Sequence, residues 1–199
     1  MATLSKTTTL EQENYELLVT KCALACARLL KRQDQSRGVY TSSRLFWQPT
    51  YKNSKRTLDC LQKSLKIADS CMDRSQAVLL FCEILQVYVE LYNENMEGLG
   101  PKYINSLLEI IDTQMIIVHT SKIDVVSGPL GAPVSLIGPI KHAHVDLALQ
   151  LIDWINVLKR DEVAALKNDV GISHGFADNE GSIGRWAEII VPDISRWGI

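Results

Sequence analysis

The sequence predicts an all-α fold, a HEAT-like α-solenoid of antiparallel helical hairpins with an irregular C-terminal segment. Every strongly periodic stretch repeats its apolar residues at helical spacing, and none alternates as a strand does. The stretch from Ala77 to about Glu94 is apolar nearly all round. Such a helix needs neighbours on several sides, as stacked hairpins provide. The chain has 199 residues, 46% of them hydrophobic, and is therefore long enough to bury a core of this kind.

The first two helices are predicted from capping and stop signals. Thr8 with Glu11, or Thr9 with Gln12, has the three-residue spacing of a capping box. The second helix is short, from about Ser36 to Trp47, and ends before Pro49 because proline disfavours helix in the preceding residue. The apolar face of the first helix is predicted at Tyr15, Leu18, Cys22, Ala25 and Leu29.

The next three helices are predicted from the same period. Asp73 is expected to cap the fourth helix by accepting from the exposed backbone amides of its first turn. Pro101 is expected to begin the fifth helix, because proline is well tolerated at the first helical position. The third helix has its apolar face at Leu58, Leu61, Leu65, Ala68 and Met72, and the fourth has a narrow polar stripe at Glu83, Gln86, Glu90 and Glu94.

The character of the chain changes after Gln114. Three prolines and three glycines among aliphatic residues mark 116–141 as a linker. A further helix is predicted from His144 to Asn168, and the glycines after Gly171 predict a loosely held end that contributes little to the core. The predicted division is a helical solenoid at 1–115, the linker at 116–141, the added helix at 142–168 and an irregular tail at 169–199.

A dense polar corner joins the first two apolar helices, with the sequence LLKRQDQSRGVYTSSRLFW from Leu29 to Trp47. Together with CALACARLLKRQDQSRGVY before the turn, and KRTLDCLQKSLKIADSCMD and LLFCEILQVYVELYNEN after it, this corner resembles a known family. The family is vacuolar protein sorting-associated protein 35, the large scaffold subunit of the endosomal retromer coat. The resemblance covers about Leu10 to Gln114 and fades beyond it.

The resemblance implies a scaffold and not an enzyme. In that family the C-terminal solenoid wraps the small metallophosphoesterase-fold subunit of retromer, while the N-terminal part, which is missing here, binds the arrestin-like subunit and most cargo. The implied function is endosome-to-Golgi retrograde protein transport, with other endosomal coat components as further partners. The implied location is cytoplasmic, with indirect, peripheral association with endosome membranes through the complex. No cofactor is implied.

The polar corner is also the predicted partner-binding surface. Arginine beside aromatic residues is the composition of interface anchors. The alternative interpretation of these cations is a solvated charged face. The same alternative applies to the cations of the third helix, Lys55, Arg56, Lys63 and Lys66. Trp47 is equally consistent with a place in the core. The predicted partner-binding residues are Arg28, Lys31, Arg32, Gln33, Asp34, Gln35, Arg37, Phe46 and Trp47.

Charge and motifs exclude several function classes. A net charge of −2 and a pI of about 6.1 provide no general attraction to nucleic acid or anionic membranes. No phosphate-binding loop or nucleophile elbow is present, so no catalytic residues are predicted. Two alternatives remain from the sequence: an unrelated helical-repeat adaptor, and a metal-dependent enzyme using His142, His144 and Asp146. Because residues two apart do not face each other on a helix, only His142 and Asp146 of this group could converge.

The five cysteines are odd in number and lie among apolar neighbours in helical patterns. This is typical of reduced core thiols in a cytosolic protein. Cys22 and Cys26 share a helix face, but no second Cys or His pair lies near them in sequence, so no metal site is predicted. The first residues lack the apolar core of a signal peptide, which also favours the cytosol.

Overall fold

The computed structural model describes residues 11–125, 143–170 and 184–197. Within these residues the fold is helical and solenoid-like, and this confirms the predicted fold class. The described residues also contain one small β-hairpin, made of two strands of two residues each. The chain divides into two compact units, residues 1–99 and residues 100–199, each with its own packed helices.

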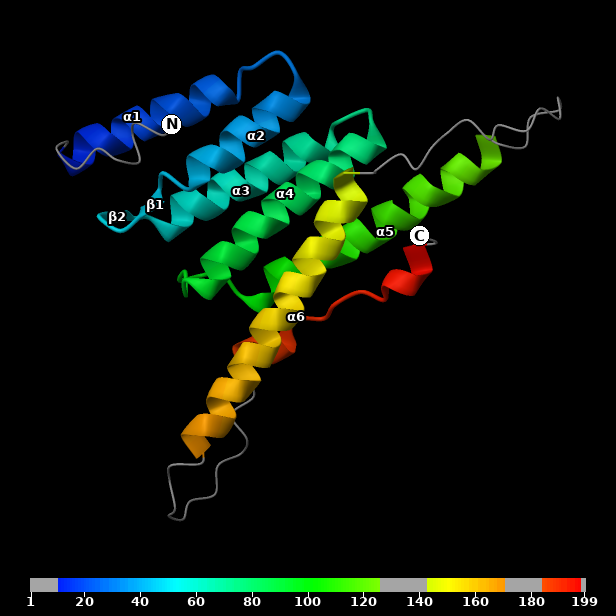
Figure 1. The fold of residues 1–199 in the computed structure, drawn as a ribbon. Helices are drawn as coiled ribbons and strands as arrows, with labels where there is room; N and C mark the ends of the chain where they lie inside the picture. Colours follow the sequence, from blue (N-terminus) through cyan, green and yellow to red (C-terminus); the bar gives the residue numbers. More distant parts are fainter. Residues whose placement is uncertain (1–10, 126–142, 171–183, 198–199) are drawn as a thin grey trace. The chain divides into compact units, whose positions relative to one another are not determined.

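The first unit consists of four helices in sequence order. They are α1 (Gln12–Cys26), α2 (Arg32–Ser43), α3 (Ser54–Asp69) and α4 (Arg74–Asn93). Each packs against the next, and the four lie side by side (Figure 1). Because the connections are short, consecutive helices run antiparallel. Helix α2 also packs against α4, as alternate helices do in a stack of hairpins.

Helix α4 supplies most of the core of the first unit. As predicted, Asp73 caps it: the carboxylate oxygen Oδ1 accepts from the backbone N–H of Ser75 at 3.0 Å and of Gln76 at 3.4 Å. Its buried residues, including Leu80 and Leu85, cover the helix except along the polar stripe, where Glu83, Gln86 and Glu90 are half-buried. Within the described residues, α4 alone is long and apolar enough to span a bilayer, yet most of it is buried in the protein, as in an ordinary core helix.

Helix α1 buries a narrower face than predicted. Tyr15 and Val19 are its buried residues, whereas Leu18 is 39% exposed and Leu29, beyond the end of the helix, is 43% exposed. The predicted apolar face is wrong at Leu18, at Leu29 and at Ala25, which is also exposed, because α1 turns only a narrow face toward α2, the helix on which it packs. The predicted caps Thr8 and Thr9 lie outside the described residues.

Helix α2 begins and ends four residues earlier than predicted. It spans Arg32–Ser43, so much of the polar corner is helical. The chain then forms a hairpin of β1 (Trp47–Gln48) and β2 (Tyr51–Lys52), which the sequence analysis did not anticipate. Pro49 lies in the turn of this hairpin, where its fixed φ suits a tight turn.

Helix α3 largely follows the prediction, with Leu61 and Ala68 buried. Its first turn is capped by Asn53, whose side-chain oxygen accepts from the backbone N–H of Arg56 at 3.1 Å. Met72 is fully exposed. Its predicted place on the apolar face is wrong because the helix ends at Asp69, three residues earlier.

The second unit contains two long helices and two short 3-10 helices. They are α5 (Pro101–Val125), α6 (Ala143–Val170), η2 (Arg185–Glu188) and η3 (Ile194–Trp197). Helix α5 begins at Pro101 as predicted, and α6 contains the predicted helix from His144 to Asn168. Helix α5 continues to Val125, past the predicted start of the linker at residue 116. The rest of that linker, residues 126–141, lies outside the described residues.

Residues 184–197, here named the C-terminal segment, pack on both long helices: η2 contacts α5 and α6, and η3 contacts α5. Trp186 is 3% exposed and Trp197 is 1% exposed. The expectation that the end of the chain contributes little to the core is therefore wrong for this segment. Large aromatic side chains anchor it without the sustained apolar period on which that expectation was based.

Candidate protein-interaction surface

The turn between α1 and α2 presents cations and leucines together. Arg28, Lys31 and Arg32 are exposed, and Leu30 between them is fully exposed. Gln35 holds this turn, because its side-chain amide donates to the carbonyl of Leu29 and accepts from Arg32 Nη1 at 3.1 Å. The turn is therefore an ordered tip with apolar and cationic side chains directed to solvent, which suits contact with another protein.

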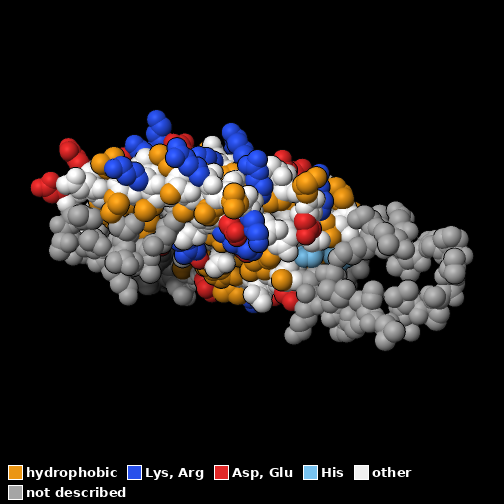
Figure 2. Space-filling model, turned by 90° about the horizontal axis from the view of Figure 1, so that it is seen from above, with side chains coloured by type: hydrophobic (Ala, Val, Ile, Leu, Met, Phe, Trp, Pro, Cys, Tyr) orange, Lys and Arg blue, Asp and Glu red, His pale blue; other side chains and the backbone are white. Residues whose placement is uncertain are grey.

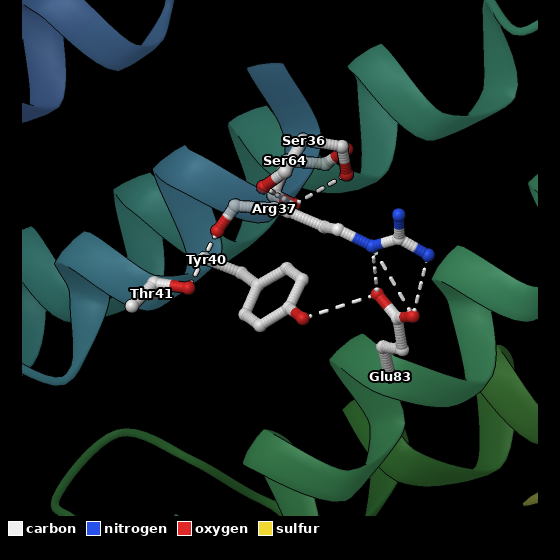
Figure 3. A network of polar contacts seen from close by, with 6 residues as sticks. All are labelled: Ser36, Arg37, Tyr40, Thr41, Ser64 and Glu83. Atoms are coloured by element: carbon white, nitrogen blue, oxygen red, sulfur yellow. Dashed lines mark hydrogen bonds and ion pairs between the residues drawn. The ribbon is translucent and has the colours of Figure 1, made fainter. Parts of the chain in front are cut away.

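Arg37 is bound to Glu83 of α4 (Figure 3). Its Nη2 lies 2.8 Å from Glu83 Oε1, and its Nε donates to Oε2 at 2.9 Å. The Tyr40 hydroxyl donates to the same carboxylate at 3.0 Å. Burial, and secondly the charge of Glu83, raises the pKa of Tyr40 to about 12. Hydrogen bonding to Glu83 also raises the pKa of Arg37. This network joins α2 to α4.

A second polar contact joins α2 to α3. The hydroxyls of Ser36 and Ser64 lie 2.9 Å apart, and Ser64 Oγ donates to the carbonyl of Ser36 at 3.0 Å (Figure 3). Both residues are fully buried. Small hydroxyl side chains that bond each other allow the two helix backbones to approach closely without leaving polar atoms unsatisfied.

The polar stripe of α4 forms a ladder of contacts with α2 and the residues after it. Arg44, which directly follows α2, has its Nη2 2.5 Å from Glu90 Oε2. Both residues lie seven positions after the corresponding members of the Arg37–Glu83 pair. Trp47 Nε1 then donates to Glu94 Oε2 at 2.7 Å. Because both sequences advance together, α2 and α4 run parallel, as alternate helices of a solenoid do. The equal seven-residue spacing was a signal of this pairing that the sequence analysis missed.

The predicted partner-binding residues fall into two groups at opposite ends of α2. Helix α2 has 12 residues, which at about 1.5 Å per residue separates its ends by roughly 18 Å. Phe46, beyond its far end, is 2% exposed and packs in a core cluster with Tyr15 and Val19. At the near end, Asp34 is exposed and Gln33 is half-buried. The structure thus does not bring all the predicted residues into one surface.

Trp47 lies beside a pocket of about 540 Å³. Its indole is half-buried, and the ammonium of Lys52 stands 5.0 Å from its ring centroid. The cation and the bond to Glu94 fix the indole at the pocket wall, so Trp47 is neither fully core nor freely solvated. The pocket is lined by Arg44, Trp47, Gln48, Pro49, Lys52, Val87, Glu90, Leu91 and Glu94.

The exposed cations of α3 share their face with apolar side chains. Arg56 is paired with Glu16 of α1 at 3.0 Å, whereas Lys55, Lys63 and Lys66 are exposed. On the side of the molecule drawn in Figure 2, Lys and Arg side chains are interspersed with hydrophobic ones. Residues of α1 and α3 contribute to a groove of about 210 Å³, lined by Thr20, Ala23, Leu24, Val39, Phe46, Arg56, Asp59, Cys60 and Lys63.

The alternative metal site is incomplete within the described residues. His144 is 5% exposed and lies with its ring centroid 6.3 Å from that of His119, whereas Asp146 is exposed. His144 is therefore buried while Asp146 faces solvent, so the two do not converge on one site. His142 lies outside the described residues. In the part of the chain that the structure describes, no three His, Cys, Asp or Glu side chains gather as metal ligands would.

The five cysteines are free thiols. Cys71 and Cys82 are buried, whereas Cys22, Cys26 and Cys60 are half-buried, so the predicted core placement holds for the first two. Burial is the main cause of a raised pKa at two of these thiols: the pKa of Cys82 is about 12 and that of Cys60 is about 11. A thiol with a raised pKa is a poor nucleophile at neutral pH, because the thiolate is the reactive form.

Comparison with known proteins places this helical unit in context. The family model described as vacuolar protein sorting-associated protein 35 matches residues 1–114. That range agrees closely with the predicted resemblance from about Leu10 to Gln114.

Individual relatives extend the match. Vacuolar protein sorting-associated protein 35 of Schizosaccharomyces pombe is 31% identical over 194 residues, which make up 94% of this chain and 21% of the relative. Vacuolar protein sorting-associated protein 35B of Arabidopsis thaliana is 34% identical over 125 residues, 58% of this chain and 16% of the relative. The chain thus spans about a fifth or less of the length of these relatives. The similarity to the first relative also continues past Gln114, where the resemblance was expected to fade.

Proposed function

Because the chain belongs to the vacuolar protein sorting-associated protein 35 family, we propose that it is a non-enzymatic scaffold of the retromer coat in endosome-to-Golgi retrograde transport. Its relatives are named as vacuolar protein sorting proteins, which supports a role in sorting. Family membership also removes the alternative of an unrelated helical-repeat adaptor. The proposed location is cytoplasmic, peripheral on endosome membranes through the other coat components.

The architecture of the first unit supports a scaffolding role. Its ionic groups Arg37, Glu83, Arg44 and Glu90 are engaged with one another between helices. Because these charged groups pair with one another across the stack, they stabilise the packing of the helices and do not line a substrate site. Stacked helices of this kind provide extended surfaces for protein contact.

The proposed partner is the small metallophosphoesterase-fold subunit of retromer, and the proposed contact is the tip formed by Arg28, Leu29, Leu30, Lys31 and Arg32. The supporting observation is that this tip combines fully exposed Leu30 with exposed cations. Apolar contact provides affinity once water is excluded, whereas the cations mainly accelerate association. Phe46 and Trp47 belong to the far end of α2 and are left out of this contact.

The test is a binding measurement with the purified small subunit. Lys31→Glu with Arg32→Glu is expected to slow association and to weaken binding more at low salt than at high salt, since exposed charges are screened over about 8 to 10 Å at physiological ionic strength. Leu30→Asp is expected to weaken binding at both salt concentrations. Lys55→Glu with Lys102→Glu makes the same charge change at exposed positions outside the tip and should leave binding unchanged.

Three outcomes would separate the parts of the proposal. Absence of binding by the folded wild-type chain would refute the proposed partner. Binding that the tip variants leave unchanged would retain the partner and remove the tip from the contact. Equal weakening by the tip variants and the control pair would indicate a non-specific effect of charge.

A further inference from the structure

The C-terminal segment is held by side chains of α5 and α6 that bind its backbone. Asn105 of α5 makes two such bonds: its Nδ2 donates to the carbonyl of Glu188 at 2.9 Å, and its Oδ1 accepts from the backbone N–H of Ile190 at 2.9 Å. From its fifth residue on, where Asn105 stands, the backbone N–H groups of an α-helix are bonded within the helix and are not available to another segment. A side-chain amide, which carries both donors and an acceptor, replaces them here.

Helix α6 binds the same segment in a similar way. The carboxylate of Glu162 accepts from the backbone N–H of Arg185 at 2.8 Å and of Trp186 at 2.7 Å. Lys159 Nζ donates to the carbonyl of Ile189. A Cβ at Gly184 would meet the Glu162 carboxylate, so a larger residue there would force this flexible side chain to shift from the position in which it accepts both bonds.

Two tryptophan side chains anchor the segment to the protein. Trp186 and Trp197 are almost completely buried. Trp197 Nε1 donates to Asp112 Oδ1 at 2.7 Å, and Arg196 Nη1 lies 3.3 Å from Asp112 Oδ2. Tryptophan contributes most to binding at protein interfaces when it is desolvated in this manner, whereas the Arg196 side chain is 59% exposed and its ion pair is weakened by solvent screening.

Backbone recognition and buried aromatic anchors are together the features of a site for linear peptides. We propose that the face of α5 and α6 under the C-terminal segment is a peptide-binding site, and that residues 184–197 are its resident occupant. The peptide it takes carries a Gly-Arg-Trp start and an Arg-Trp end, as this segment does. The same segment supplied on a separate molecule binds there when the resident one is weakened.

Open space beside the resident segment agrees with this proposal. A cavity of about 290 Å³ lies between the segment and α5, and Ile190 in the segment is 73% exposed. The segment thus fills only part of the surface available to it. The cavity is lined by Asn105, Leu108, Glu109, Asp112, Ile190, Pro192 and Arg196.

The experiment uses the full chain and a fluorescent peptide of residues 184–197. Trp186→Ala with Trp197→Ala in the full chain weakens the resident segment, so the peptide is expected to bind this variant about tenfold or more tightly than it binds the wild-type chain. Fluorescence anisotropy measures both affinities. A peptide carrying the same two substitutions should lose at least about tenfold in affinity. Asn105→Ala in the variant chain should weaken binding of the unsubstituted peptide.

A variant with wild-type helix content that gains no affinity for the peptide would overturn the proposal. If the double variant instead loses helix content, the unsubstituted peptide should restore it, as circular dichroism can show, and failure to restore it would equally overturn the site. Binding of the small retromer subunit, measured on the same variant, tests the function proposed above. The two results are independent because this proposal needs no retromer partner.

Discussion

Removal of the Glu83 carboxylate is expected to loosen α2 from α4 by a measurable amount. The carboxylate accepts three hydrogen bonds from Arg37, at 3.2, 2.9 and 2.8 Å, and one from Tyr40 at 3.0 Å. Glu83→Ala leaves the Tyr40 hydroxyl and the Arg37 guanidinium without this acceptor. Glu83→Gln keeps an acceptor but removes the charge, and so separates hydrogen bonding from ion pairing.

The magnitude follows from exposure. Hydrogen bonds to a charged group are typically worth about 1.5–3 kcal/mol. The Arg37 side chain is 38% exposed and that of Glu83 is 19% exposed, so solvent screening reduces the value. We expect Glu83→Ala to lower the free energy of unfolding by about 1–2 kcal/mol. For a chain of this length this lowers the Tm by roughly 3–6 °C.

Urea unfolding of four proteins measures the coupling directly: the wild type, Arg37→Ala, Glu83→Ala and the double variant. The expected interaction energy between the two sites is about 1 kcal/mol. A matched control replaces the exposed Glu97 with Ala, which should change stability by less than about 0.5 kcal/mol. Strict additivity of the two single substitutions would refute the claim that this ion pair holds α2 to α4.

Further substitutions test packing and titration in the first unit. Leu85→Asp is expected to abolish cooperative unfolding, measured by circular dichroism, because Leu85 is 1% exposed and a charge buried there has no partner. The control Leu30→Asp, at a fully exposed position, should leave the unfolding transition unchanged. Gly38→Ala should lower the stability of the chain despite the higher helix propensity of alanine, because the added Cβ would lie 2.7 Å from Cys26 Cβ. Adding Cys26→Gly to this variant should recover part of the lost stability in urea unfolding. Equal stability of the single and double variants would contradict the clash. Tyr40 contributes stability that is complete below its usual pKa of 10.0 and is lost as the pH rises through about 12, so the advantage of the wild type over Tyr40→Phe should shrink across that window. Cys82 is fully buried and should be alkylated only when the chain unfolds, whereas alkylation in the native state, detected by mass spectrometry, would contradict its burial.

Helix positions followed from the sequence because the 3.6-residue period of apolar side chains, and the caps that bound it, can be recognised in consecutive residues. Asp73 was identifiable as a cap from its place before an apolar run, and Pro101 as a start for a similar reason. The predicted boundaries of α2 were less accurate, since Pro49 does not itself end the helix. The helix ends at Ser43, and Pro49 lies in the turn of the hairpin that follows. Nothing in the local pattern distinguishes a helix that runs to Trp47 from one that ends at Ser43.

The candidate site was predicted less completely than the fold. Composition grouped Arg28 with Trp47, yet the intervening helix carries these residues to opposite ends. Arg37 and Arg32 look alike in sequence, but Glu83 engages Arg37, whereas Arg32 lies at the exposed tip. The partner of a long charged side chain depends on which helix lies opposite, and this is a property of packing.

The sequence by itself determined that the chain is helical, where its most buried helix lies, and which family it belongs to, because periodicity and family motifs are written in consecutive residues. The tertiary structure alone decided that the polar stripe of α4 pairs with α2 and that Trp186 and Trp197 are core residues. Both outcomes depend on contacts between residues about 45 to 85 positions apart in the chain. The physical reason is that the burial of a polar or aromatic side chain is set by whichever distant segment covers it, and no local pattern records that segment.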